Sequence, residues 1–144
     1  MKKILLIGVL LVASLYGIIN ERQLIPTEKK YEENSSAALE RVIAEKKGNV
    51  QVQGHGTVTR ILPDDTRGSK HQRFIVTIPS GQTLLISHNI DLAPGIHSLR
   101  TGDSVEFSGE FEWNPQGGVI HWTHHDPAGR HVPGWIIHNG KRYD

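Results

Sequence analysis

The chain has 144 residues, with 16 Lys and Arg against 15 Asp and Glu, so its formal charge at pH 7 is +1. That balance argues against the strongly basic surface of a typical nucleic-acid-binding protein, and the length leaves room for one domain. The chain contains no cysteine, which excludes disulfides, thiolate zinc sites and lipid attachment through an N-terminal cysteine. Any bound metal must therefore be held by histidine, carboxylate or backbone oxygen.

Residues 1–20 are typical of a signal peptide or a membrane anchor. Lys2 and Lys3 precede an uncharged apolar run over residues 4–19. The run is long for a signal peptide and slightly short for a spanning helix, which needs about 20 residues, so the sequence leaves cleavage and retention open. Because the positive charges come first, the chain beyond the run is expected to cross the membrane. We therefore expect an extracytoplasmic protein, periplasmic or secreted, that contacts the inner membrane through residues 4–19 if the run is retained.

Residues 21–48 are polar and charged, and they are predicted to form a linker that contains one short helix. Asn34 or Ser35 is a suitable N-cap for this helix, and Gly48 is a suitable end. Its apolar stripe is narrow and consists of Leu39, Val42 and Ile43. We therefore expect the helix to pack lightly on the domain or to stay mobile.

Residues 49–144 show a strand-like pattern in which short segments are separated by Gly, Pro, Asp and Asn. Five strands are predicted, at residues 50–62, 71–78, 82–88, 103–112 and 119–123. Residues 89–99 have the spacing of a helical turn or two, interrupted by Pro94. In the fourth strand Phe107 is expected to point to the core, and in the fifth strand Ile120 and Trp122 are expected to do the same.

This order of elements predicts a mainly β fold: a small five-stranded OB-like barrel with a short helical connector, preceded by an N-terminal hydrophobic helix. An open sandwich of similar strands is the alternative. Ligands usually bind at the mouth of such a barrel. The strand ends that carry His71, His88 and His121 are expected to converge there.

Several sequence blocks are unusual enough to identify a relationship. They are Gly54-His55-Gly56, His71-Gln72-Arg73-Phe74, residues 80–86, residues 88–94 and residues 121–126. Over residues 50–144 these blocks resemble the bacterial domain-of-unknown-function 3465 family. The resemblance implies an exported bacterial protein with a small β-rich domain. The family name states no activity, so it assigns no catalytic residues.

Five of the nine histidines lie between residues 121 and 138, and imidazole is the commonest protein ligand for metals. A bend at Asp126-Pro127 is expected, since Asp favours turns and a residue before proline avoids the helical region. The bend would bring His131 back towards His124, His125 and Asp126, which gives the three or four ligands that zinc or another divalent ion needs. The alternative is that these histidines bond to turn backbone and fill a polar corner beside Trp122 and Trp135.

No Gly-x-Ser-x-Gly turn, cysteine nucleophile or Gly-rich phosphate loop occurs in the sequence. A hydrolase such as a nuclease would need a metal-bound water, with His124 or Glu112 as base. We therefore expect an exported binding module with the His-rich loop as its functional surface, and we keep a metal-dependent hydrolase as the alternative. Whether the protein is an enzyme stays open, and the ligand is not identified. The residues expected to contact it are His71, Arg73, His88, His121 and Trp135.

Charge gives little support to nucleic acid as the partner. Over residues 49–144 eight Lys and Arg face nine Asp and Glu, which leaves a net charge of −1 for the predicted domain. Binding of a phosphate backbone depends on an excess of positive charge. Nucleic acid is therefore not the expected ligand.

Overall fold

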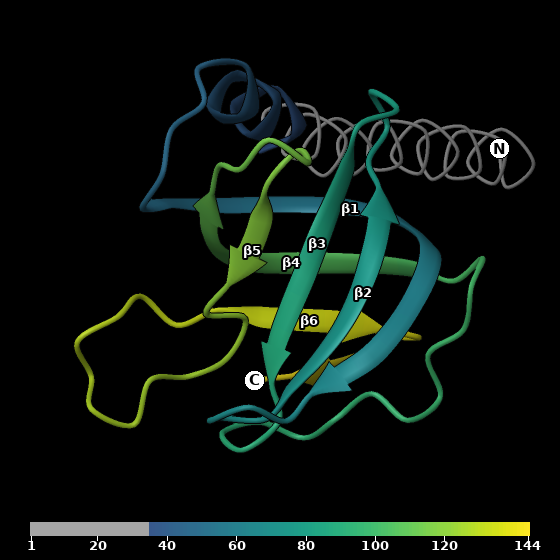
Figure 1. Cartoon of the computed structure of the whole chain (residues 1–144), viewed down its shortest axis with the longest axis vertical. Helices are drawn as coiled ribbons and strands as arrows, with labels where there is room; N and C mark the ends of the chain where they lie inside the picture. Colours follow the sequence, from purple (N-terminus) through teal and green to yellow (C-terminus); the bar gives the residue numbers. More distant parts are fainter. Residues whose placement is uncertain (1–34) are drawn as a thin grey trace, which may run out of the picture. The chain divides into compact units, whose positions relative to one another are not determined.

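Residues 35–144, the part of the chain that this computed structural model describes, contain seven strands and one short helix, joined by turns and loops (Figure 1). The helix covers residues 35–44. The strands are β1 (Val50–Asp65), β2 (His71–Thr77), β3 (Thr83–Asn89), β4 (Ser104–Glu112), β5 (Val119–His121), β6 (Trp135–His138) and β7 (Lys141–Tyr143). The predicted N-terminal hydrophobic helix and the first half of the predicted linker, residues 21–34, lie outside the described residues. Within residues 35–144 no helix has the length and hydropathy needed to span a membrane.

Five strands pair in a closed ring in the order β1-β2-β3-β5-β4 and back to β1, and only the β3–β5 pairing is parallel. Closure depends on the length of β1, whose first half pairs with β4 and whose second half pairs with β2. Figure 1 shows β1 bending between these two pairings. Gly56 precedes Thr57, the residue at which the two pairings meet, and an added Cβ would stand 2.8 Å from the carbonyl oxygen of Thr77. A residue without a side chain is therefore needed there.

Two strands that the sequence analysis did not predict extend the sheet beyond the ring. β6 pairs with β4, and β7 pairs with β6, which gives a mixed sheet of seven strands instead of the five expected. The turn between β6 and β7 is Asn139-Gly140, with φ angles of 51° and 72°. Asn-Gly with both φ angles positive is the turn that matches the twist of a two-residue hairpin.

The core lies inside the ring and continues under the helix. Phe74, Phe107 and Phe111 are fully buried, as the strand pattern predicted for Phe107. Leu39 of the helix is 1% exposed and belongs to the same core cluster, so the helix packs more closely than its narrow stripe predicts. Gly54 makes room for it, because a Cβ at Gly54 would lie 2.7 Å from Leu39 Cδ2. The helix belongs to the compact unit that begins at Ser35.

Two local predictions are wrong. The expected short helical connector at residues 89–99 is a series of turns without a helix; the side chain of Asn89 accepts the Asp91 N–H at 2.9 Å, a local bond that competes with helix formation. The last ring strand ends at His121, because Trp122 has a φ of 53° and leaves the extended conformation. Trp122 is consequently half-buried, and Thr123 and His124 are the residues that turn inward.

Candidate functional site

A partly open pocket of about 200 Å³ lies where β2 begins and where β3 and β5 end. β2 contributes His71 and β3 contributes Asn89, which face each other across the two strands in the antiparallel register. β5 contributes His121, and the loop that follows it contributes Trp122 and His124. The full lining is His71, Ser87, Asn89, Leu92, His121, Trp122 and His124. Three imidazoles therefore share a pocket lined by no Asp, Glu, Lys or Arg.

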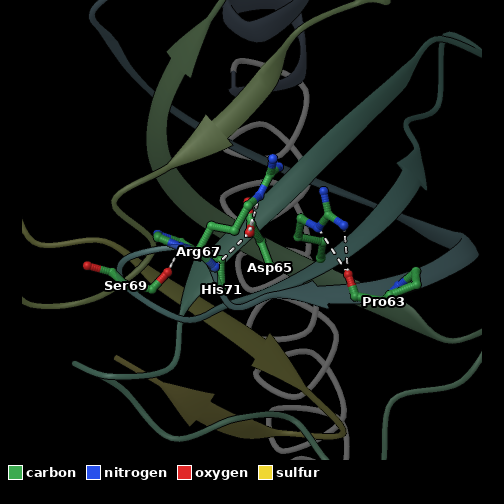
Figure 2. A network of polar contacts seen from close by, with 6 residues as sticks. Pro63, Asp65, Arg67, Ser69 and His71 are labelled. Carbon is green, nitrogen blue, oxygen red and sulfur yellow. Dashed lines mark hydrogen bonds and ion pairs between the residues drawn. The ribbon is translucent and has the colours of Figure 1, made fainter.

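The first imidazole, His71, has a defined tautomer. Its Nδ1 lies 2.8 Å from the carbonyl oxygen of Ser69 (Figure 2). A carbonyl oxygen only accepts hydrogen bonds, so Nδ1 carries the hydrogen and the neutral ring keeps a lone pair on Nε2. Asp65 holds the preceding turn by accepting the Arg67 N–H at 3.0 Å. That bond, together with the Arg67 guanidinium, keeps the pKa of Asp65 below its usual value.

His124, in the loop that follows β5, makes the same kind of contact. It is 3% exposed, and its Nδ1 lies 2.7 Å from the carbonyl oxygen of His125, so Nδ1–H is the donor. The Nε2 lone pair is again left for another group. Backbone carbonyls that hold one ring nitrogen in this way also fix the ring's orientation.

The loop between β5 and β6 is organised around the carboxylate of Asp126. Its two oxygens accept the N–H groups of Ala128 at 2.9 Å, Arg130 at 2.9 Å and His131 at 3.1 Å. The Ala128 bond is the largest cause of the lowered pKa of Asp126, and the other two bonds add to it. In Figure 1 this loop extends to one side of the sheet. The bend predicted at Asp126-Pro127 is thus present, and its carboxylate caps backbone groups.

His131 fixes the loop to the sheet and to Trp122. Its ring stacks on the Trp122 indole with centroids 4.1 Å apart and planes 9° apart. Its Nε2 lies 2.9 Å from a carboxylate oxygen of Glu110 on β4. Gly134 closes the loop by donating its N–H to the His124 carbonyl at 3.0 Å, and a Cβ at Gly134 would collide with the carbonyl oxygen of Trp122. These contacts hold Trp122 and His124 in place as one wall of the pocket.

His88 is buried beside the pocket without lining it. Its Nε2 lies 3.1 Å from the Pro94 carbonyl and its Nδ1 lies 2.8 Å from Thr123 Oγ1, so Nε2–H donates and Nδ1 accepts the hydroxyl hydrogen. Burial lowers the pKa of His88 to about 4. Burial and the neighbouring His71 also lower the pKa of His121. Both effects favour the neutral forms of His88 and His121 at pH 7.

Of the five residues predicted to contact a ligand, two line the pocket. His71 and His121 share the pocket, and His88 packs beside it. Arg73 donates its Nε and Nη2 to the Pro63 carbonyl at 3.0 and 2.9 Å, the contact at the right of Figure 2. Trp135 begins β6, where the guanidinium of Arg142 lies 5.2 Å from its ring centroid. Neither Arg73 nor Trp135 lines the pocket.

The four residues predicted to bind a metal occupy one loop, but they face different groups. His124 lines the pocket, His125 is exposed, Asp126 accepts three backbone N–H groups and His131 contacts Glu110. Within residues 35–144 no three His, Asp or Glu side chains are grouped so as to hold one ion. A metal held by these four residues stays a prediction.

Four lining residues were missed by the sequence analysis: Trp122, which was expected in the core, and Ser87, Asn89 and Leu92. Ser87 and Asn89 alternate on β3, and Leu92 follows in the turns after that strand. The signal was present in the hairpin: a turn at residues 79–81 that pairs Thr77 with Thr83 also places His71 opposite Asn89. Since alternate residues share one face of a strand, Ser87 is then on the side of Asn89.

These features define a small β protein that carries an imidazole-lined pocket on a ring of five strands. The chain belongs to the family described as protein of unknown function (DUF3465), whose family model matches residues 25–144. The match includes the helix, all seven strands and every lining residue of the pocket. No curated protein matches the chain.

Proposed function

We propose that the protein is an exported binding module in which an OB-like barrel presents the imidazole-lined pocket to a small ligand. Support for export comes from Lys2 and Lys3 before the apolar run at residues 4–19. Support for the OB-like interpretation comes from the order of the ring, β1-β2-β3-β5-β4, closed by the β1–β4 pairing.

One observation carries the binding proposal. His71 and His124 each donate Nδ1–H to a backbone carbonyl, and both rings line the same pocket. Fixing a ring reduces the conformational entropy lost when a ligand binds, so fixed acceptors are what a binding site requires. The His-rich loop then acts as one wall of the site, together with the ends of β2, β3 and β5.

The pocket suits binding better than general acid–base catalysis. No carboxylate lines it, so a catalytic imidazole would lack the acidic partner that commonly orients it. Carboxylates close in sequence to the lining residues are already engaged, Asp91 with the Lys70 N–H at 2.8 Å and Asp126 with three backbone N–H groups. Glu110, on β4 beside β5, contacts His131.

A divalent metal is the second candidate ligand, and a metal-dependent hydrolase would follow from it. The Nδ1–H to carbonyl contacts of His71 and His124 favour it, because metal-binding histidines are usually oriented in this way. A zinc ion, however, needs ring nitrogens at about 2.0–2.1 Å. A pocket of about 200 Å³ between the rings leaves more room than one ion fills, so a small molecule is the better fit.

The proposal is tested by NMR titration of the isotopically labelled full chain, kept in a detergent without sugar headgroups. The probes are glucose, glycine, sodium phosphate and zinc sulfate, added to about 20 mM because ligands this small bind with dissociation constants of about 1 mM. We expect at least one probe to shift the backbone amides of His71, Asn89 and His121. The matched variant Ser87→Leu fills the pocket and should remove these shifts. Shifts that are absent in the native chain, or unchanged in Ser87→Leu, would contradict a binding site here.

A further inference from the structure

We infer, on the basis of the proposed function, that the pocket takes one neutral sugar unit, either a free monosaccharide or the terminal unit of a longer saccharide. Four properties of the lining lead to this ligand class: its lack of charge, its hydrogen-bonding polarity, its apolar surfaces and its size.

The charge of the lining favours a neutral ligand. The seven lining residues include no acidic side chain and no Lys or Arg. An ionised phosphate, carboxylate or ammonium group loses its hydration on entering such a pocket and finds no ion of opposite charge. A neutral ligand avoids that cost.

The hydrogen-bonding polarity of the lining is mixed. His71 and His124 offer acceptors at Nε2, since Nδ1–H of each ring is bound to a carbonyl. Asn89 uses its side-chain oxygen to accept the Asp91 N–H, which leaves its NH₂ group as a donor. Ser87 provides a hydroxyl that both donates and accepts. A ligand that satisfies this set needs several O–H donors close to oxygen acceptors, which is the pattern of neighbouring hydroxyls on a sugar ring.

Two lining residues are apolar or aromatic. Leu92 is 45% exposed, and the indole of Trp122 is held by its stack on His131. A sugar ring combines its hydroxyls with an apolar C–H face, so it complements both kinds of surface. A bare metal ion or a phosphate uses neither Leu92 nor the indole.

Size limits the ligand to one ring. The volume of about 200 Å³ is below the roughly 300–1,000 Å³ of pockets for drug-sized ligands. The pocket is partly open, so the reducing or non-reducing end of a longer saccharide also fits if the rest of the chain lies in solvent.

The test is an NMR titration of the full chain with neutral hexoses (glucose, galactose, mannose) and N-acetylglucosamine. Maltotriose and chitotriose represent longer saccharides, and zinc sulfate and sodium phosphate are the charged probes. We expect saturable shifts at His71, Asn89 and His121 with at least one sugar. A trimer that binds as well as its monomer shows that the pocket accepts the terminal unit of a longer saccharide, and a trimer that does not bind restricts the pocket to a free monosaccharide.

Three variants locate the binding. His71→Phe keeps a ring and removes the acceptor, so sugar affinity should fall by about tenfold, the loss of one hydrogen bond of about 1.4 kcal/mol. Ser87→Leu fills the pocket without removing an imidazole and should abolish binding. His97→Phe changes an exposed histidine outside the pocket and should bind as the native chain does.

The outcomes distinguish a failure of the sugar inference from a failure of the proposed binding site. Pocket shifts with zinc or phosphate but with no sugar would overturn the sugar assignment and leave a binding module of another class. No pocket shifts with any probe would overturn both. Sugar shifts that persist unchanged in Ser87→Leu would place the sugar elsewhere and refute the inference.

Discussion

Acidification should destabilise the domain through His88, a fully buried imidazole whose two ring nitrogens are both bonded. Burial lowers its pKa from 6.5 to about 4. In the unfolded chain His88 takes up a proton as the pH falls below about 6.5, whereas in the folded chain it stays neutral down to about pH 4. The unfolded state therefore binds more protons in this window, and the free energy of unfolding falls as the pH falls.

The magnitude follows from the two pKa values. Each pH unit between 6.5 and about 4 lowers the free energy of unfolding by about 1.4 kcal/mol, so His88 alone removes about 3 kcal/mol. That is a large part of the 5–15 kcal/mol that stabilises a typical small domain. Above pH 6.5 the group contributes no pH dependence, and below about pH 4 the loss levels off because both states are protonated.

Urea unfolding of the full chain at a series of pH values between 7.5 and 4, followed by near-UV circular dichroism, measures this effect. His88→Gln keeps one donor and one acceptor but does not titrate, so its pH dependence should be smaller than that of the native chain by about 3 kcal/mol. His97→Gln, which alters an exposed histidine, should keep the native pH dependence. If His88→Gln and the native chain lose the same stability between pH 6.5 and 4, the buried neutral imidazole is not the cause. Should His88→Gln fail to fold, NMR of the native chain still decides, since a His88 ring protonated at pH 5.5 would refute the reasoning.

Three further predictions concern the packing and the loop. Leu39→Ala should lower the free energy of unfolding in urea by about 2–5 kcal/mol, because Leu39 is buried in the core. Ile61→Ala, at an exposed position, is the control and should change it by less than about 0.5 kcal/mol. Equal effects would show that the helix does not pack on the sheet. Gly134→Ala should prevent the loop from closing on Trp122, since a Cβ would meet the Trp122 carbonyl, and a native-like melting temperature would contradict this. Asp126→Ala should speed hydrogen exchange at Ala128, Arg130 and His131, whose N–H groups the carboxylate accepts. In the native chain the Asp126 carboxylate should lose its stabilising contribution only below pH 3.8, because its pKa is lowered. Hydrogen exchange that the substitution leaves unchanged would show that Asp126 does not hold the loop.

The five ring strands could be predicted because their apolar residues alternate and their turns contain Gly, Pro, Asp and Asn. β6 and β7 were missed; they have four and three residues, and β5, which also has three, was predicted only as part of the longer segment 119–123. The Asn139-Gly140 turn between them was nevertheless a usable signal. The connector was predicted as a helix from the spacing of Leu92 and later leucine and isoleucine residues, whereas local bonding by the Asn89 side chain favours turns.

The site was only partly accessible to sequence reasoning. Strand ends indicated that His71 and His121 meet, and the structure brings them into one pocket. The positive φ of Trp122 was not predictable, since tryptophan has no preference for that conformation. It turns Trp122 out of the core and Thr123 into it, and Trp122 then lines the pocket together with His124. The contact between His131 and Glu110 joins segments 21 residues apart and depends on the folded sheet.

The tautomers of the imidazoles give the most direct test of the proposed site, because the site is defined by ring nitrogens that are free to accept hydrogen bonds. Two-dimensional NMR that correlates the ring nitrogens with the ring carbon-bound hydrogens, recorded on the full chain at pH 8, identifies the tautomer of each neutral histidine. We predict Nδ1–H with an unprotonated Nε2 for His71 and His124, and Nε2–H for His88. Nε2–H at His71 and His124 would mean that the pocket lacks its acceptors, and it would contradict the proposed site.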